Sequence, residues 1–490
     1  MNADLILVLD AGTTSTRAIA FSRAGDIVAS TSRPLTQHFP HSGWVEHDAG
    51  EIWRLSRDCL IAVADAVGAA RIAAIGITNQ RETVVFWDQT SGEAIAPAIV
   101  WQDRRTTETC AAMQAAGHEP MVQAATGLLL DPYFSATKIR WGLDNWPQVA
   151  AAHADGRLRV GTVESWLIWK LSAGARHITD ATNASRTALM RLATCEWDAE
   201  LLVLFGVPAD ILPEITDCAG ALAVTALLGH DIAITGSAGD QQAAAVGQAC
   251  LVPGQLKATY GTGCFLLAHA GAVPPVSGHR LLSTVAWRLD GVAAYALEGA
   301  IFTAGAAVQW LRDGLGIIAD SSETAALADS VPDSGGVVFV PALAGMGAPH
   351  WNPAARGTLT GLSGGTTRAH IVRATLEAMG QQTADLVDAL AADGVVAARL
   401  RVDGGMVAND WLCQDLADSL GISVERPREI ETTALGAAML AGVGIGWFAD
   451  LDAAAAMAAA DRSFVPASDA GARAARRAAW ARAVCQTLAV

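Results

Sequence analysis

Apolar and polar stretches alternate along the chain in a pattern typical of an α/β protein. Apolar runs of strand length, at residues 5–9 and 232–234, stop at turns rich in glycine, threonine or charged side chains. Apolar residues at helical spacing follow a capping box of Asp48 and Glu51, and they recur over residues 366–390. Strands that alternate with helices predict sheets whose faces are covered by helices.

The turn at mid-chain carries one carboxylate, that of Asp240. Gly236 and Gly239 stop the apolar run, and Asp240 precedes a helix predicted over 243–246. A strand, a glycine turn and a helix form a βα junction, which is where open α/β sheets bind ligands. Asp240 either caps this helix or is an ionised carboxylate aimed into a cleft, as a general base must be. The segment alone favours the cap.

The first apolar run and a second one at residues 18–21 predict a β-hairpin. Its turn carries a glycine and four consecutive hydroxyl residues, with Asp10 before them and Arg17 after them. Such a turn is either an ordinary polar hairpin tip or a phosphate cradle, in which main-chain N–H groups and hydroxyls bond phosphate oxygens. In the second case Asp10 would face a metal ion.

Later turns repeat this theme. The apolar run over 72–77 leads to Arg81 and Glu82, which are either a surface pair or a donor beside an acceptor, suited to neighbouring hydroxyls of a polyol. Segments 257–268 and 400–409 each place a glycine-rich turn after a strand. The recurrence predicts two related domains, and several such turns predict a ligand held from more than one side.

Composition narrows the possible partners. Of 490 residues, 52% are hydrophobic and 17% charged, which is a globular composition. A net charge of −16 argues against a broad surface for nucleic acid or anionic membrane, because those partners need clustered lysine and arginine. The eight cysteines contain no Cys-x-x-Cys pair, and the first residues lack the basic region of a signal peptide. We expect reduced, buried cysteines and a cytoplasmic protein without membrane insertion.

Two well-known functional motifs, the serine-hydrolase G-x-S-x-G pattern and the P-loop, do not apply to this chain. Residues 361–365 fit the G-x-S-x-G pattern, but the sole later histidine, His370, falls in the first turn of the next helix and is poorly placed as a base. No G-x-x-x-x-G-K-[ST] sequence occurs, so any nucleotide would not be held in a P-loop.

Together the turns resemble the FGGY carbohydrate kinases from Leu5 to about Phe448, and within that family the members that phosphorylate glycerol. The matching motifs include Asp10-Ala11-Gly12-Thr13-Thr14, Gly43-Trp44-Val45-Glu46-His47-Asp48, Thr78-Asn79-Gln80-Arg81-Glu82-Thr83, Asp131-Pro132-Tyr133-Phe134, Gly239-Asp240-Gln241-Gln242, Tyr260-Gly261-Thr262-Gly263-Cys264-Phe265 and Asp403-Gly404-Gly405 with Asn409. The resemblance implies an α/β fold of two actin-like or ribonuclease H-like domains that close on a central cleft. Residues 1–242 would hold the substrate and the phosphate loop, and residues 243–490 the nucleotide.

The resemblance also implies ATP-dependent phosphorylation of glycerol to sn-glycerol 3-phosphate, with Asp240 as general base. The substrate would contact Arg81, Glu82, Trp101, Tyr133, Asp240, Gln241 and Phe265. ATP would contact Thr13, Thr14, Ser15, Arg17, Thr262, Gly305, Gln309, Gly405 and Asn409. Mg²⁺ would lie at Asp10 and Asp240, with Asp10 binding it mainly through water.

Two alternatives stay open. One is a kinase of another small polyol or ketose in the same family, against which Trp101 and Phe265 argue because bulky aromatics leave little room for a fourth carbon. The other is an actin-like, ATP-driven switch without a phosphorylated product. A homo-oligomer, dimer or tetramer, is expected, and the helix around Leu376 would serve an interface or a core equally well. Residues 218–230 lack the glycine and arginine loop that binds fructose 1,6-bisphosphate in regulated members, so that regulation is not expected.

Overall fold

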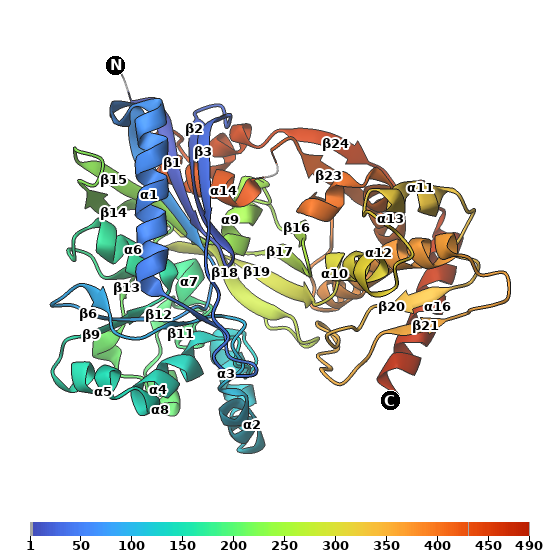
Figure 1. Cartoon of the computed structure of the whole chain (residues 1–490), viewed down its shortest axis with the longest axis horizontal. Coiled ribbons are helices and arrows are strands. Elements are labelled where there is room, and N and C mark those ends of the chain that lie inside the picture. The colour runs from blue at the N-terminus through green and yellow to red at the C-terminus, as the bar shows by residue number, and fades with distance from the viewer. Residues whose placement is uncertain (1–2, 430, 490) are drawn as a thin grey trace.

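The chain forms two lobes, each built on one large sheet (Figure 1). The computed structural model describes residues 3–429 and 431–489. The first sheet consists, in spatial order, of β14 (Ala219–Thr225), β15 (Ile232–Gly239), β5 (Ile72–Asn79), β1 (Leu5–Ala11), β2 (Ser15–Ser22) and β3 (Ile27–Pro34). The second consists of β18 (Leu282–Leu289), β19 (Val292–Ile301), β17 (Cys264–Gly271), β16 (Gln255–Tyr260), β22 (Arg399–Asp403), β23 (Ser423–Pro427) and β24 (Ala460–Phe464).

The two sheets share one topology. In the first, β1 pairs antiparallel with β2 and parallel with β5, β15 continues parallel to β5, and β14 closes the edge antiparallel. In the second, β16 takes the place of β1, with β17, β22, β23 and β24 in the corresponding positions and orientations. Strand β18 is the one addition. This arrangement confirms the predicted α/β fold of two related domains.

Strand β1 shows why its sequence is a continuous apolar run. Leu5, Leu7 and Leu9 pack in one core with α1 (Ala49–Val67) and α6 (Val163–Leu171), while Ile6 and Val8 pack on the other face with α14 (Thr432–Gly444). Successive side chains of a strand point to opposite faces, so a strand covered on both sides needs apolar residues at every position.

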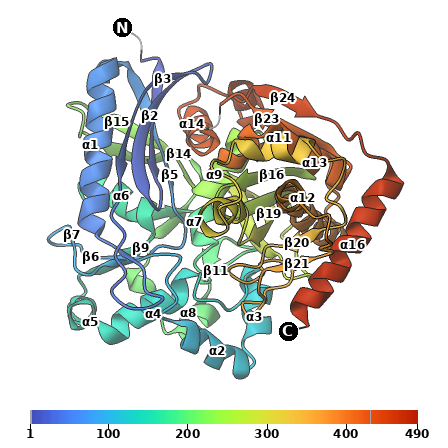
Figure 2. The ribbon, with the colours of Figure 1, turned by 45° about the vertical axis from the view of Figure 1, so that its right-hand side comes forward.

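Helix α14 crosses from the second lobe to the first. It follows β23 in the chain but packs against β15, β5, β1 and α9 (Asp240–Gly247) of the first lobe, and Figure 2 shows it beside those strands. A Cβ on Gly76 would lie 2.5 Å from the Ala437 carbonyl oxygen, so glycine permits this close approach. The predicted boundary after residue 242 falls inside α9, and the domain division stays a prediction.

The remaining helices surround the two sheets. A long insertion between β5 and β15 forms the lower part of the first lobe in Figure 1, with β6 (Val85–Asp88), α2 (Thr107–Ala115), α3 (Glu119–Thr126), α4 (Ser135–Asn145), α5 (Pro147–Ala154), β9 (Leu158–Gly161), α7 (Ala181–Ala184) and α8 (Ala199–Phe205). The second lobe carries α10 (Gly305–Gln309), α11 (Glu323–Asp329), α12 (Arg368–Ala392), α13 (Asp410–Leu420) and α16 (Ala470–Leu488). Within the described ranges, no helix combines the length and the apolar character needed to cross a bilayer.

Several local predictions can be compared with these elements. The hairpin of β1 and β2 and the long helix α12 are confirmed. The capping box of α1 is half formed: Asp48 accepts the Gly50 N–H at 2.8 Å, but Glu51 accepts the Thr36 hydroxyl instead. Seven cysteines are buried as predicted, whereas Cys485 is exposed on α16. Leu376 is 1% exposed in the chain's own core, so an interface role for it is not needed.

Candidate active site

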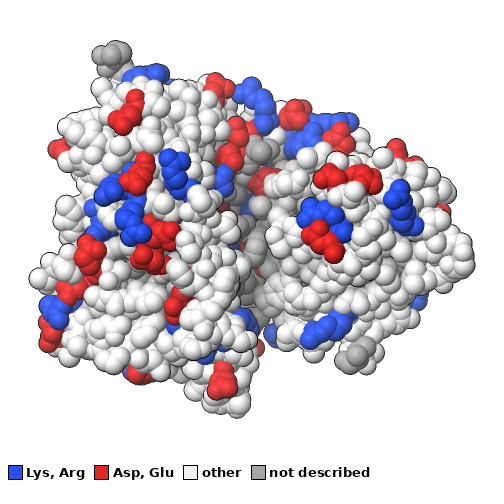
Figure 3. Space-filling view, in the orientation of Figure 1, with Lys and Arg blue, Asp and Glu red and all other residues white. Residues whose placement is uncertain are grey.

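The turn between β1 and β2 contacts the predicted substrate wall. Gly12 N donates to the Ser15 carbonyl at 3.0 Å, which closes the turn. Thr14 is exposed and Thr13 is half-buried. Trp101 Nε1 donates to Thr13 Oγ1 at 2.9 Å. The hydroxyl-rich turn therefore lies directly beside a bulky ring. Figure 3 shows a furrow between the two lobes.

Asp10 and Arg17 face each other across β1 and β2, as the register of the hairpin requires. Arg17 Nε lies 3.2 Å from Asp10 Oδ2, and Arg17 Nη1 donates to the Glu431 carboxylate. Burial raises the pKa of Asp10 to about 7, with Asp240 and Glu431 adding to the rise and Arg17 opposing it. A cation between Asp10 and Asp240 would relieve the repulsion of their charges.

Asp240 is the first residue of α9, and Gly239 is the N-cap. Asp240 is not the N-cap residue, but the capping contact predicted for it is present: Asp240 Oδ1 accepts the Gln241 N–H at 2.7 Å, and the same oxygen lies 3.2 Å from Arg81 Nε. The side chain is 31% exposed. Burial raises the pKa of Asp240, while Arg81 and Lys257 lower it. Lys257 also donates to the side chain of Gln241, so Asp240 and Gln241 are held together and part of the carboxylate stays open to a ligand.

Arg81 and Glu82 form a buried turn, so the surface-pair interpretation is wrong. They are 3% and 1% exposed. Thr83 N donates to the Arg81 carbonyl at 2.7 Å, and Glu82 has a φ of +60°, which costs a residue with a Cβ roughly 1–2 kcal/mol. The tight turn directs the two side chains to different main partners, although Arg81 Nε and Glu82 Oε1 remain 4.0 Å apart. Arg81 reaches Asp240, while Glu82 Oε1 accepts from Arg186 Nε at 2.6 Å.

Three aromatic rings gather at the same place. The Trp101 ring lies 5.6 Å from Tyr133 and 6.3 Å from Phe265, measured between centroids. The Tyr133 hydroxyl is 3.4 Å from Arg81 Nη2. Because Phe265 belongs to β17, the second lobe supplies one side of this cage. All seven predicted substrate residues thus lie in one connected cluster.

A pocket of about 690 Å³ lies beside the second hairpin turn, between α10, α11 and α13. Five predicted nucleotide residues line it, namely Thr262, Gly305, Gln309, Gly405 and Asn409. Gly305 packs so closely that an added Cβ would lie 2.6 Å from the Gly261 carbonyl oxygen. The volume suits a ligand of nucleotide size. The pocket is also lined by Arg312, Ser321 and Trp411, which were not predicted as nucleotide contacts from the sequence.

Sequence comparison decides the family. The N-terminal domain model of the FGGY family of carbohydrate kinases matches residues 5–247, and its C-terminal domain model matches residues 256–445. The chain belongs to the FGGY family of carbohydrate kinases. The resemblance expected from the motifs is confirmed.

Other FGGY kinases are similar along the whole chain. The glycerol kinase of Rhodospirillum centenum is 54% identical over 488 residues, 98% of each chain, and glycerol kinase 1 of Pseudomonas aeruginosa is 54% identical over 453 residues, 91% of each. The crystal structure of Plasmodium falciparum glycerol kinase with ADP is 35% identical and superposes with a TM-score of 0.95 over 99% of both chains. The xylulose kinase of Rhodospirillum rubrum is 26% identical, with a TM-score of 0.88 over 99% of this chain and 98% of its own.

The site of this FGGY kinase includes three charged residues that the sequence prediction missed. Glu298, Arg186 and Lys257 are each fully buried beside the substrate cluster. Glu298 and Lys257 are lone charges in otherwise apolar strands, β19 and β16, and that isolation is a signal that could have found them. Arg186 follows a short polar helix and gives no comparable signal.

Asp10 and Asp240 suit a divalent cation that keeps most of its water. In the described part of the chain, no cluster of three or more histidine, cysteine, aspartate or glutamate side chains is placed to hold a metal. Mg²⁺ commonly uses one or two carboxylates together with phosphate oxygens and waters. The raised pKa of Asp10 fits this arrangement, because it marks a carboxylate that lacks a sufficient counter-charge.

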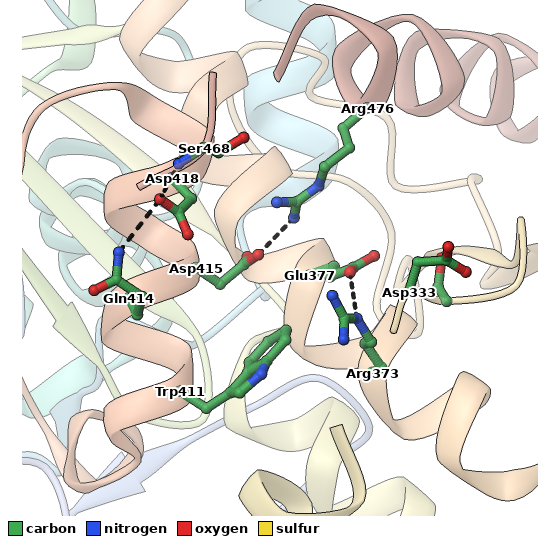
Figure 4. Close-up of a pocket in the computed structure, with 10 residues that line it drawn as sticks. Asp333, Arg373, Glu377, Trp411, Gln414, Asp415, Asp418, Ser468 and Arg476 are labelled. Atoms are coloured by element: carbon green, nitrogen blue, oxygen red, sulfur yellow. Dashed lines mark hydrogen bonds and ion pairs between the residues drawn. The ribbon is translucent and has the colours of Figure 1, made fainter. Parts of the chain in front are cut away.

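A second pocket, of about 320 Å³, lies between α12, α13 and α16 and contains none of the predicted site residues (Figure 4). Arg476 on α16 pairs with Asp415 on α13 at 2.6 Å, and Arg373 pairs with Glu377 within α12 at 2.9 Å. The first pair joins two helices of the second lobe, and the second pair lies within one helix.

Proposed function

We propose that the chain transfers the γ-phosphoryl group of ATP to glycerol and forms sn-glycerol 3-phosphate. The observation that carries the proposal is the cluster of Asp240, Arg81 and three aromatic rings directly beside the hydroxyl-rich first turn. A small alcohol in this cluster would stand within reach of a phosphate on that turn. The glycerol kinases that are 54% identical to the chain support glycerol as the alcohol.

The proposed substrate contacts divide by chemistry. Arg81, Glu82, Tyr133, Asp240 and Gln241 supply donors and acceptors for the three hydroxyls, while Trp101 and Phe265 pack on the carbon chain. Glycerol has one hydroxyl on every carbon, so a site for it needs polar groups on one side and an apolar wall on the other.

The proposed reaction relies on positioning and on charge. Asp240 orients the attacking hydroxyl and accepts its proton, and its open carboxylate beside two cations supports that role. Thr13, Thr14, Ser15, Arg17 and Thr262 hold the phosphates, and the pocket residues Gly305, Gln309, Gly405 and Asn409 hold the rest of the nucleotide. Asp10 and Asp240 would hold Mg²⁺, which would neutralise part of the phosphate charge. Closure of the lobes excludes water that would otherwise accept the phosphoryl group.

A coupled assay of ADP formation across a panel of polyols tests the proposal. We expect glycerol to give the highest kcat/KM, with a phosphorylated product that a glycerol-3-phosphate dehydrogenase oxidises. Comparable kcat/KM for erythritol or xylulose would favour the second candidate, a kinase of a larger polyol or ketose, which the likeness to a xylulose kinase supports. Phosphate release without any polyol would favour an ATP-driven switch and contradict the proposal.

Location and assembly are part of the same proposal. We propose a cytoplasmic enzyme, because all eight cysteines are free, including the exposed Cys485. We also propose a homo-oligomer, dimer or tetramer. Light scattering coupled to gel filtration tests the assembly, and a monomeric mass at working concentration would contradict it.

A further inference from the structure

One buried carboxylate of the second lobe binds two arginines of the first. Glu298 on β19 is fully buried, and its two oxygens accept from Arg81 Nη1 at 2.6 Å and from Arg81 Nη2 at 3.2 Å. Arg186 Nη2 donates to the same carboxylate at 3.1 Å. Burial alone would raise the pKa of Glu298, but Arg186 and Arg81 outweigh it and lower the pKa to about 2. The group is therefore ionised throughout the working pH range.

The contacts of Arg81 are divided between Glu298 and the site. Glu298 takes both terminal nitrogens, which leaves Nε 3.2 Å from Asp240. Gln242 Oε1 accepts from Nη1 at 3.2 Å, and the Tyr133 hydroxyl lies 3.4 Å from Nη2. The Tyr133 contact is the longest of these, so Nη2 is the donor most open to a substrate hydroxyl. A planar guanidinium whose two terminal nitrogens both donate to one carboxylate can direct its remaining N–H donors in only one direction.

We propose that Glu298 is a positioning residue for the alcohol substrate: it fixes the orientation of Arg81 across the junction of the lobes. The inference rests on the proposed function. It assigns to the second lobe, which carries the nucleotide pocket, control over a substrate contact in the first.

If Glu298 only held the two lobes together, its removal would affect stability and kinetics in a different way. Breaking that connection would lower the melting temperature and raise KM for both substrates by similar factors. Glu425 on β23 provides the matched control, because it bridges Arg399 at 3.2 Å and Arg401 at 3.0 Å in the same sheet and lies outside the substrate cluster.

The experiment measures kcat, both KM values and the melting temperature for the wild type, Glu298→Gln, Glu298→Asp and Glu425→Gln in the full chain. For Glu298→Gln we expect glycerol KM to rise about 30-fold or more and ATP KM to change less than about threefold. Glu298→Asp keeps the charge but withdraws it by one methylene, so glycerol KM should stay about fivefold raised or more. Glu425→Gln should match the wild type.

Each outcome decides a separate question. Glycerol KM within about twofold of wild type in folded Glu298→Gln, or equal rises in both KM values, would overturn the inference. If Glu298→Gln fails to fold, Glu298→Asp decides alone, and wild-type kinetics in that variant would overturn it. A wild-type chain that does not phosphorylate glycerol would end the proposed function instead, and the two failures are therefore distinguishable.

Discussion

The two lobes share a strand order but differ in where they carry charge. The first hairpin turn is flanked by Asp10 and Arg17, whereas the corresponding turn of the second lobe is flanked by Tyr260 and Cys264, which are uncharged at neutral pH. The next strand of the first lobe, β5, leads to Arg81 and Glu82. Its counterpart β22 runs into a short 3₁₀ turn beginning at Gly405.

This difference separates chemistry from binding. Transfer of a phosphoryl group needs charges placed at the reacting atoms, while the rest of a nucleotide needs a shaped pocket with close main-chain approach. In the proposed reaction, the first lobe would supply the former through Asp10, Arg17, Arg81 and Asp240, and the second would supply the latter through glycines and amides. Two lobes with the same backbone fold can therefore have different roles through their side chains alone.

Removing the central charge of the first lobe should have the largest effect. In Asp240→Asn the carboxamide cannot accept the proton of the attacking hydroxyl, so we expect kcat to fall about 10²-fold or more with a smaller change in KM. Steady-state kinetics with glycerol and ATP measures this. Asp231→Asn, on an exposed side chain of the same lobe, is the control and should be unchanged. An unaltered kcat in Asp240→Asn would remove Asp240 from the reaction.

Crowding the neutral pocket of the second lobe should act on one substrate only. In Gly305→Ala the added Cβ would lie 2.6 Å from the Gly261 carbonyl oxygen, so the turn must shift. Overpacking of this kind predicts a rise in ATP KM of about 10- to 100-fold, with glycerol KM nearly constant. Gly364→Ala is the control, since a Cβ there meets nothing within 4 Å. Equal effects on both substrates would break the division between the lobes.

The sequence was most informative where local rules act. The hairpin of β1 and β2, the two-sided burial of β1 and the long helix α12 follow from apolar periodicity, turn chemistry and helix length, all of which are read over short distances. The family motifs were equally informative, because each is a turn whose shape depends on the residues in it.

Contacts between segments far apart in the chain could not be predicted from the sequence. Glu298 meets Arg81 and Arg186 from positions more than 100 residues away, and no local pattern sets that distance. The cap predicted for Asp240 was incomplete for the same reason: Asp240 Oδ1 accepts the Gln241 N–H at the start of α9, but no local pattern predicted its pairing with Arg81, which follows β5. Arg81 and Glu82 likewise look like a surface pair until the fold buries them.

The first turn should respond to pH where the second cannot. Burial raises the pKa of Asp10 to about 7, so the carboxyl is mostly protonated at pH 6 and mostly ionised at pH 8. A protonated carboxyl is a poor Mg²⁺ ligand, and apparent Mg²⁺ affinity should therefore weaken about tenfold from pH 8 to pH 6. Titrating Mg²⁺ at fixed ATP measures it. Asp10→Asn should lose this dependence except for the part due to ATP itself, and an identical slope in that variant would contradict the assignment.

The smallest expected effect probes the one side chain that the second lobe adds to the substrate wall. Phe265 closes the cage against Trp101, at 6.3 Å between centroids, and its removal should make room for a fourth carbon. In Phe265→Ala we expect the ratio of kcat/KM for erythritol to that for glycerol to rise about three- to tenfold, because an apolar wall discriminates only modestly by size. Phe302→Ala, on a side chain that is 40% exposed, is the control and should leave the ratio unchanged. A constant ratio in Phe265→Ala would mean that the first lobe alone sets substrate size, and the second lobe would then reach the alcohol only through Glu298 and Lys257.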